Sequence, residues 1–287
     1  MLQVLTAVGA LGGLTFALTS LLVAAHRRLY VEEDPRIDAV EEMLPHSNCG
    51  ACGQPGCRPF AEALVRGEVD PAGCTVGTSA EHARIAAFLG VDVGTALRRT
   101  ARLACAGGAN VARDHAVYDG AQSCVAAALA AGGPKACFWG CIGLSDCAAV
   151  CDFDAIHMNT HSLPVVDEDA CTACGDCVEV CPKDLFTIHD VGHRLWMACR
   201  SLEAGDAILD DCEVACTACG RCAMDAPDLV AMEGGLAVVD HSKPPRREAI
   251  DRCPTGAIVW IDAERGPVKG PAAKKIVRRG PLPAART

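Results

Sequence analysis

One run of the sequence carries four cysteines at the spacing of a metal-cluster motif, and a proline follows the last of them. They are separated by two, two and three residues: Cys171, Cys174, Cys177 and Cys181, before Pro182. Three thiolates this close bind one cubane [4Fe-4S] cluster from a tight loop, while the fourth ligates a neighbouring cluster. A zinc site is the alternative for any two cysteines two residues apart. The full pattern favours iron and sulfide, and it requires a second cluster in the chain.

The cysteine content of the whole chain favours metal centres over disulfides. Twenty of the 287 residues are cysteine, and most lie two to five residues from another, where crossed disulfides would be strained. Aromatic residues make up only 4% of the chain, so large conventional cores are not expected. We therefore expect the soluble part to depend on its clusters for folding free energy and to unfold without iron.

A second set of four cysteines lies nearer the N-terminus and can complete one cluster by itself: Cys49, Cys52, Cys57 and Cys74. Glycines between the first three allow the backbone to close around an inorganic core. The sequence also predicts a helix over 59–67, and another that starts at the capping box Thr78-Ser-Ala-Glu81 and ends at Leu89. A small helical domain with one [4Fe-4S] cluster is expected, with zinc as the alternative.

The C-terminal half contains an internal repeat. Aligning Cys141 with Cys216 also matches the cysteines four residues upstream of each. The same register matches the Cys-Pro pair at Cys181 with the pair at Cys253, three residues earlier in the second copy. Two ferredoxin-type modules in tandem are the expected architecture.

In the first repeat, the rule of the remote fourth ligand predicts two clusters. One set is complete: Cys151, Cys171, Cys174 and Cys177. The other contains Cys141, Cys147 and Cys181, but Leu144 occupies the middle position. Cys137 is the nearest thiol and the expected fourth ligand. If Cys137 does not reach the site, a [3Fe-4S] cluster on three cysteines is the alternative.

The second repeat keeps one complete set: Cys216, Cys219, Cys222 and Cys253. Its partner set is missing, because Ala226 replaces the remote cysteine and residues 243–252 contain no cysteine. The chain is therefore expected to hold four [4Fe-4S] clusters. Four thiols are left over and are interpreted as small buried apolar side chains: Cys105, Cys124, Cys199 and Cys212.

The N-terminus has the composition of a membrane anchor. Residues 2–25 carry no charge, and His26-Arg27-Arg28 follows them. This length can cross a hydrocarbon layer of about 30 Å. A cleaved signal peptide would carry positive charge before a shorter apolar stretch. An uncleaved single-pass anchor in the cytoplasmic membrane is predicted, and the positive-inside rule places the soluble part on the cytoplasmic side.

Charge and motifs exclude several function classes. The net charge is −10, and residues 264–287 carry a local +6, which leaves −16 for the rest. An acidic body does not suit nucleic acid. The histidines are scattered, and the sequence shows neither a catalytic acid, base or nucleophile nor a glycine-rich dinucleotide motif after a strand. One-electron transfer without a catalytic site of its own is the chemistry that remains.

The expected fold class is α+β. The expected divisions are a transmembrane anchor (1–27), a linker with a small helical 4Fe-4S domain (28–95), a connecting segment (96–135), a two-cluster bacterial-ferredoxin-like module (136–192), a single-cluster module (193–262) and a basic tail (263–287). Prolines and glycines in the tail predict disorder.

The order of these parts resembles a known family. An N-terminal anchor, the Cys49 motif, Cys105-Ala-Gly-Gly, the segment around Cys137 and Cys141, and the ferredoxin modules together resemble the RnfB family of the Rnf electron transport complex, in its longer form. The Cys49 motif alone is also similar to one in corrinoid iron–sulfur proteins. Asp152, where a proline is usual after Cys151, and the missing cluster depart from the family pattern.

The resemblance implies an electron-transfer component of an ion-translocating ferredoxin:NAD oxidoreductase. Its expected partners are soluble ferredoxin, the other Rnf subunits and the membrane, with no nucleic acid. The alternative function is a membrane-tethered reductase relay that keeps a soluble iron–sulfur protein reduced without ion pumping. A zinc-binding adaptor is a further alternative from another class.

Overall fold

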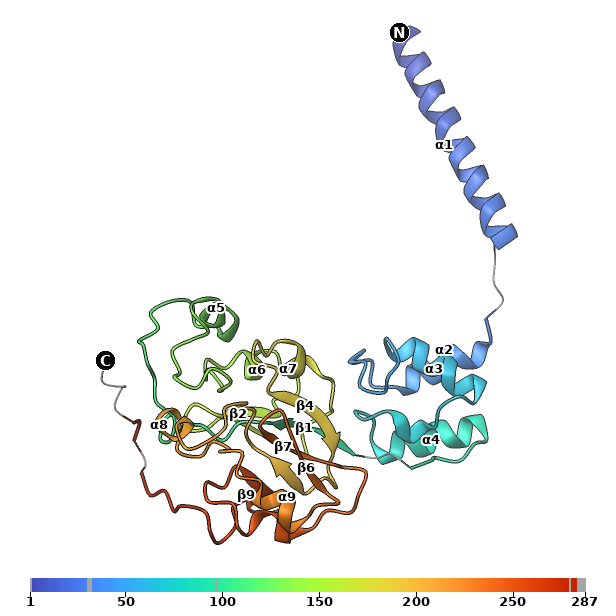
Figure 1. Cartoon of the computed structure of the whole chain (residues 1–287). Helices are drawn as coiled ribbons and strands as arrows, with labels where there is room; N and C mark the ends of the chain where they lie inside the picture. The colour runs from blue at the N-terminus through green and yellow to red at the C-terminus, as the bar shows by residue number, and fades with distance from the viewer. Residues whose placement is uncertain (1, 30–32, 96–97, 279, 283–287) are drawn as a thin grey trace.

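The computed structural model describes residues 2–29, 33–95, 98–278 and 280–282. It consists of a long separate helix, a small helical domain and a larger body of short strands and helices (Figure 1). This mixture of helix and strand agrees with the expected α+β class.

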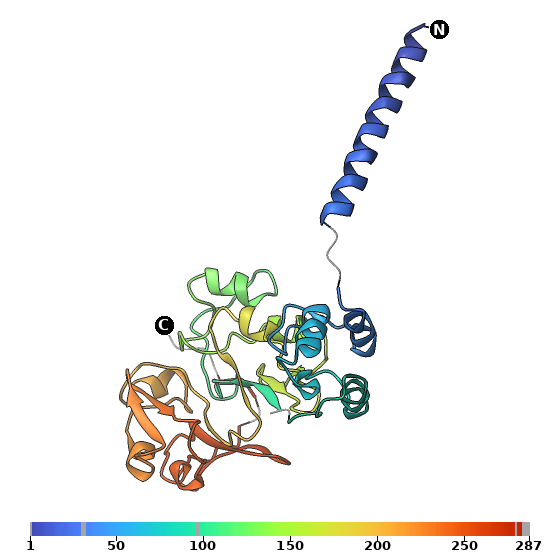
Figure 2. The same ribbon diagram turned by 90° about the vertical axis from the view of Figure 1, so that its right-hand side faces the viewer.

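The N-terminal helix α1 (Leu2–Leu29) projects away from the rest of the chain (Figures 1 and 2). Its segment Val8–Leu29 has a mean hydropathy of 1.9, and none of it is buried against the protein. Large apolar side chains such as Phe16 and Leu22 are therefore exposed, which water disfavours and hydrocarbon does not. By length and composition the helix suits a membrane span.

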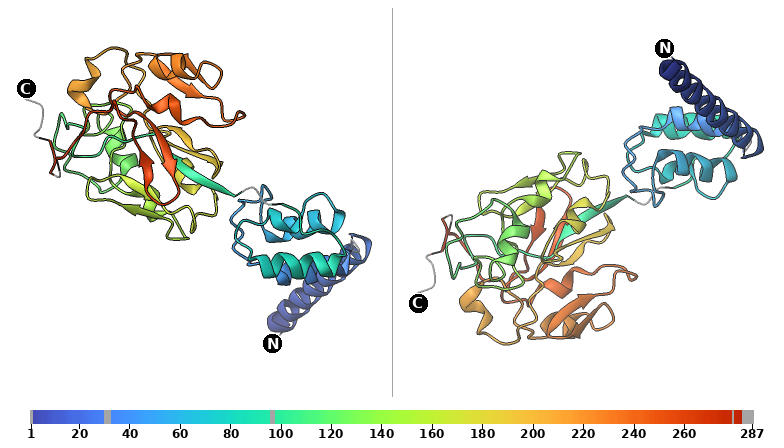
Figure 3. Two further views of the ribbon diagram at one scale, coloured as in Figure 1. Left: turned by 90° about the horizontal axis from the view of Figure 1, so that it is seen from below. Right: turned by 90° about the horizontal axis from the view of Figure 1, so that it is seen from above.

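The small domain packs three helices around one core. They are α2 (Pro35–Met43), α3 (Cys57–Arg66) and α4 (Ser79–Leu89), with a 3-10 turn at Pro71–Gly73. Phe60, Ile85 and Val40 are fully buried between them. Both predicted helices are confirmed, and the side chain of Thr78 caps α4 while Glu81 bonds the Thr78 backbone N–H. Figure 3 shows this domain set apart from the larger body.

The larger body contains four small antiparallel sheets. Strand β1 (Arg99–Leu103) pairs with β4 (Phe186–Asp190), and β2 (Ile156–Met158) pairs with β3 (Pro164–Val166). The second half has the same arrangement: β5 (Leu195–Met197) pairs with β8 (Ile258–Asp262), β8 also pairs with β9 (Gly266–Val268), and β6 (Val230–Glu233) pairs with β7 (Leu236–Val239). We call residues 99–190 and 195–262 the first and second repeats.

Short helices connect the strands. They are α5 (Cys124–Leu129), α6 (Asp146–Ala149), α7 (Asp176–Glu179), α8 (Ile208–Asp211), α9 (Arg221–Asp225) and a 3-10 turn at Arg247–Ile250. Each repeat surrounds a compact core, with Phe186 in the first and Ile258 in the second.

Two parts of the chain are more ordered than the sequence suggested. The segment predicted as a connection (96–135) supplies β1, which pairs with β4 along its whole length. The tail predicted to be disordered begins with β9, and Lys274 N–H then bonds to the carbonyl of Pro254. Arg278 also pairs with Glu213 at 3.3 Å. Composition alone misled here, because these segments obtain their hydrogen bonds from distant parts of the chain.

Candidate iron–sulfur sites

Three loops with the same backbone shape present most of the predicted ligands. In Cys171-Thr-Ala-Cys-Gly-Asp-Cys177, Ala173 and Gly175 adopt positive φ angles of 61° and 102°. Ala218 and Gly220 do so in the loop from Cys216, and Gly143 and Ser145 in the loop from Cys141. A left-handed residue costs free energy unless it is glycine. The shared strain indicates that each loop is shaped to turn its thiols inward.

Four small cavities in the larger body are each lined by four thiols. Their empty volumes are nearly equal, about 330, 340, 340 and 320 Å³. We name them the central set (Cys105, Cys137, Cys199, Cys212), the Cys216 set (Cys216, Cys219, Cys222, Cys253), the Cys124 set (Cys124, Cys141, Cys147, Cys181) and the Cys171 set (Cys151, Cys171, Cys174, Cys177). Four convergent thiols around an empty space are the donor set that a cubane cluster requires.

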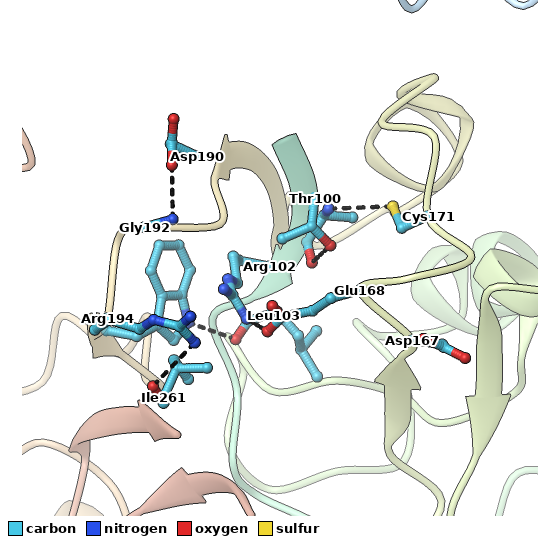
Figure 4. Close-up of polar contacts among 12 residues, drawn as sticks. Thr100, Arg102, Leu103, Asp167, Glu168, Cys171, Asp190, Gly192, Arg194 and Ile261 are labelled. Atoms are coloured by element: carbon cyan, nitrogen blue, oxygen red, sulfur yellow. Dashed lines mark hydrogen bonds and ion pairs between the residues drawn. The ribbon is translucent and has the colours of Figure 1, made fainter. Parts of the chain in front are cut away.

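The Cys171 and Cys216 sets contain the cysteines that the sequence grouped together. The remote Cys151 follows α6 and faces the loop from Cys171, and Cys253 faces the loop from Cys216. The backbone N–H of Ala101 in β1 also donates to the Cys171 thiol at 3.5 Å (Figure 4).

The Cys124 set differs from the prediction, because Cys124 takes the place assigned to Cys137. Cys124 begins α5, and Asp146 at the start of α6 holds that turn in place. One oxygen of Asp146 accepts from the Ser123 hydroxyl at 2.9 Å and from the Val125 N–H at 3.2 Å. The thiol of Cys124 therefore reaches the space that Leu144 leaves without a ligand.

Cys137 lies instead in the central set, with three cysteines that the sequence had left over. Cys105 follows β1, Cys199 follows β5, and Cys212 follows α8. The interpretation of Cys105, Cys124, Cys199 and Cys212 as small apolar side chains is not what the structure shows, because every one of them lines a cavity with three other thiols.

The small helical domain holds the remaining four cysteines. Cys57, Cys74 and Cys52 belong to one core, and the mutual repulsion of their thiolates raises the pKa of Cys74, although burial is the larger cause. Cys49 lies three residues before Cys52 in the loop that precedes α3. Asn48 secures this loop by accepting the Cys57 N–H at 2.8 Å. We call these four the N-terminal set.

Burial makes these thiols poor acids until a cation arrives. It raises the pKa of Cys141, Cys177 and Cys199 to about 12 each, against an ordinary value near 9. Burial also raises the pKa of Cys212 to about 12 and that of Cys147 and Cys222 to about 11. At neutral pH the apo sites hold thiols, and iron binding must release their protons.

A sequence signal for the central set existed but was weak. Leu103-Ala-Cys105 after β1 and Met197-Ala-Cys199 after β5 occupy equivalent positions in the two repeats. The number of cysteines, twenty, is also five sets of four. The long gaps from Cys105 to Cys137 and from Cys137 to Cys199 conceal the set, because its ligands come from both repeats.

Comparison with known proteins agrees with these sites. A family model described as "Putative Fe-S cluster" matches residues 44–76, which include the N-terminal set. A second, described as "4Fe-4S binding domain", matches residues 163–186, which include the loop from Cys171.

Relatives with similar sequences cover most of the chain, and all three described here are B subunits of their complexes. The chain is 37% identical over 259 residues to that of the Na(+)-translocating ferredoxin:NAD(+) oxidoreductase complex of Acetobacterium woodii, covering 89% of this chain and 77% of the relative. It is 38% identical over 265 residues to the proton-translocating counterpart of Clostridium ljungdahlii, covering 91% of each. It is 32% identical over 240 residues to that of the ion-translocating oxidoreductase complex of Methanosarcina acetivorans, covering 83% of this chain and 91% of the relative. The chain therefore belongs to the RnfB family of ion-translocating ferredoxin:NAD oxidoreductase complexes.

Proposed function

We propose that this chain is the iron–sulfur electron-transfer component of a membrane-bound, ion-translocating ferredoxin:NAD oxidoreductase complex. The observation that carries the proposal is the sorting of all twenty cysteines into five sets of four, in a chain that begins with a helix of membrane-spanning length. Bound at these sites, [4Fe-4S] clusters supply one-electron transfer. We assign five clusters, one more than the sequence suggested, with all twenty cysteines as ligands.

The sets of the larger body form a connected series. Cys147 of the Cys124 set and Cys151 of the Cys171 set flank the end of α6, four residues apart. Four residues also separate Cys137 from Cys141, and thus the central set from the Cys124 set. Four residues of extended chain span at most about 14 Å. Each link therefore keeps neighbouring sites close, as a relay requires.

The series continues at both ends. Cys212 of the central set is four residues before Cys216, which begins the loop of the last set. At the other end, strand β1 touches both the Cys171 set and the small helical domain. Its Ala101 N–H reaches the thiol of Cys171, and its Arg99 guanidinium donates to the carbonyl of Ala51, between Cys49 and Cys52, at 2.6 Å.

The two ends of the series suit different partners. Cys219 is the one exposed cysteine in the described part of the chain, so we assign soluble ferredoxin to the surface around the Cys216 set. The N-terminal set lies nearest in sequence to α1 and is assigned to exchange with the membrane subunits. His26, Arg27 and Arg28 at the end of α1 favour the cytoplasmic side for the soluble body.

Anaerobic analysis of the purified full chain tests the cofactor assignment. We expect about twenty irons and as many sulfides per chain from five cubanes. About sixteen irons with Cys105 and Cys212 open to thiol alkylation would remove the central cluster. Zinc without sulfide would refute electron transfer by this chain.

Ion uptake by inverted membrane vesicles tests the complex. Reduced ferredoxin should drive NAD reduction together with sodium or proton uptake, and both should be lost when Cys222→Ala replaces the native chain. NAD-independent oxidation of ferredoxin without ion uptake, with the same dependence on Cys222, would instead support the reductase relay.

A further inference from the structure

Three histidines from different segments meet on one side of the larger body. His189 lies near the end of β4, His193 lies in the turn between β4 and β5, and His241 follows β7. One ring nitrogen from each lies within 4.8 Å of the others, and all three residues are half-buried. None belongs to the iron–sulfur sites described above. The sequence treated His189 and His193 as isolated, because pairing of the strands is what brings all three together.

The distance between two of the ring nitrogens suits a shared ion. His189 Nδ1 and His193 Nδ1 are 3.3 Å apart. Zinc binds imidazole nitrogen at about 2.0–2.1 Å with tetrahedral angles, which places two such nitrogens about 3.3–3.4 Å apart. The two rings are thus already spaced as two ligands of one tetrahedral ion.

A neighbouring hydroxyl prepares His189 for this role. Its Nε2 lies 3.1 Å from the hydroxyl oxygen of Thr187, two residues earlier on the same face of β4. When Nε2–H donates to that oxygen, Nδ1 keeps its lone pair and faces His193. Metal-binding histidines commonly donate their second ring N–H in this way, which fixes the tautomer and the ring orientation.

The surroundings hold the rings and leave one side open. The ring of His241 stacks on that of His193 with centroids 4.5 Å apart, and Trp196 meets His189 edge-on at 4.8 Å. Trp196 is itself fixed, because its indole N–H donates to the carbonyl of Leu103 at 2.8 Å. His189 and His241 also line a cavity of about 970 Å³. Water from this cavity can occupy a fourth coordination position.

We propose that His189, His193 and His241 bind one zinc-class divalent cation, with water as the fourth ligand. Imidazole is a preferred ligand of Zn²⁺, whereas magnesium and calcium prefer oxygen. A small rotation of His241 away from its stacked position closes the site. The ion would tie the loop after β7, in the second repeat, to β4 of the first repeat. It would act as a clamp between the repeats, separate from the electron-carrying sites.

Zinc binding to the cluster-loaded full chain tests the proposal. The protein is dialysed anaerobically against buffered ZnCl₂, and zinc and iron are measured in the same sample. We expect one tightly bound zinc per chain, with nitrogen or oxygen neighbours near ~2.0 Å in its X-ray absorption spectrum and without the ~2.3 Å sulfur shell of a thiolate site. His193→Gln and His241→Gln should each weaken zinc binding by more than about 100-fold, and Thr187→Val by about 10- to 100-fold.

His157→Gln is the matched control, because His157 is exposed on β2, outside the three-histidine site. It should bind zinc as the native chain does. Equal zinc affinity in the native, His193→Gln and His241→Gln proteins would overturn the proposal, as would a sulfur shell around the bound zinc. Thr187→Val removes only the hydroxyl that bonds His189, so its zinc affinity decides the question if the histidine variants lose iron.

Discussion

Cys105 and Cys199 occupy equivalent positions in the two repeats and line the same cavity. The thiol of Cys105 accepts the N–H groups of Gly107 and Cys141 at 3.4 and 3.5 Å. The thiol of Cys199 accepts those of Ser201 and Cys216 at 3.5 and 3.3 Å. Matching backbone donors stabilise thiolate charge at both positions. The central set is thus built symmetrically, with two thiols from each repeat.

Removing either of these thiols should therefore cost one cluster. Cys199→Ala is expected to lower the iron content by about four per chain and to leave the other sets loaded. The measurement is iron and sulfide analysis with low-temperature paramagnetic resonance of the reduced protein. Cys105→Ala should give the same spectrum. An unchanged iron content in both variants would contradict the assignment of the central set.

The two candidates for the fourth ligand beside Leu144 can be separated. Cys124→Ala should convert the site of Cys141, Cys147 and Cys181 to a three-iron cluster, which is paramagnetic when oxidised. Cys137→Ala should leave that site intact and affect the central set instead. The resonance of the oxidised protein distinguishes the two, and a three-iron signal from Cys137→Ala alone would restore the sequence-based assignment.

Local spacing explains how much of the site could be predicted. The Cys171 and Cys216 loops carry three ligands within seven residues, so their grouping follows from the sequence. Cys124 could not be placed, because its position depends on the contact of α5 with Asp146, 22 residues away. The central set depends on the packing of two repeats. The helices were easier, because the Thr78 cap and the glycines after α3 and α4 are local signals.

A buried ion pair beside the Cys171 set should contribute strongly to stability. Arg102 in β1 is almost fully buried, and its guanidinium pairs with Glu168 at 2.5 Å (Figure 4). Glu168→Ala leaves a buried charge without its partner, which costs about 3 kcal/mol. The urea midpoint for loss of visible cluster absorbance should fall accordingly. Asp169→Ala, which breaks the exposed pair with Arg98, should change stability by less than about 1 kcal/mol.

The cap of α4 should make the small helical domain sensitive to acid. The Thr78 N–H, followed by the Thr78 hydroxyl, donates to the carboxylate of Glu81 and holds its pKa below the ordinary value of 4.5. Because the folded-state pKa is lowered, this contribution is fully present above about pH 4.5 and is lost as the pH falls through the folded value. Hydrogen exchange of α4 should therefore rise at acid pH in the native chain. In Glu81→Gln that extra acid sensitivity should be smaller, and an identical pH profile would contradict the assignment.

Lys135 should set the reduction potential of the central set. It is buried, its ammonium group donates to the carbonyl of Gly107 at 2.7 Å, and its side chain lines the central cavity. A buried positive charge stabilises the electron-rich state of a nearby centre, since protein interiors screen charge less than water does. Lys135→Met should lower the midpoint potential of the central site by about 60 mV, a tenfold change in a one-electron equilibrium. A redox titration followed by paramagnetic resonance measures it. Lys135→Arg keeps the charge and should restore most of the potential, whereas equal shifts in both variants would indicate an effect of packing.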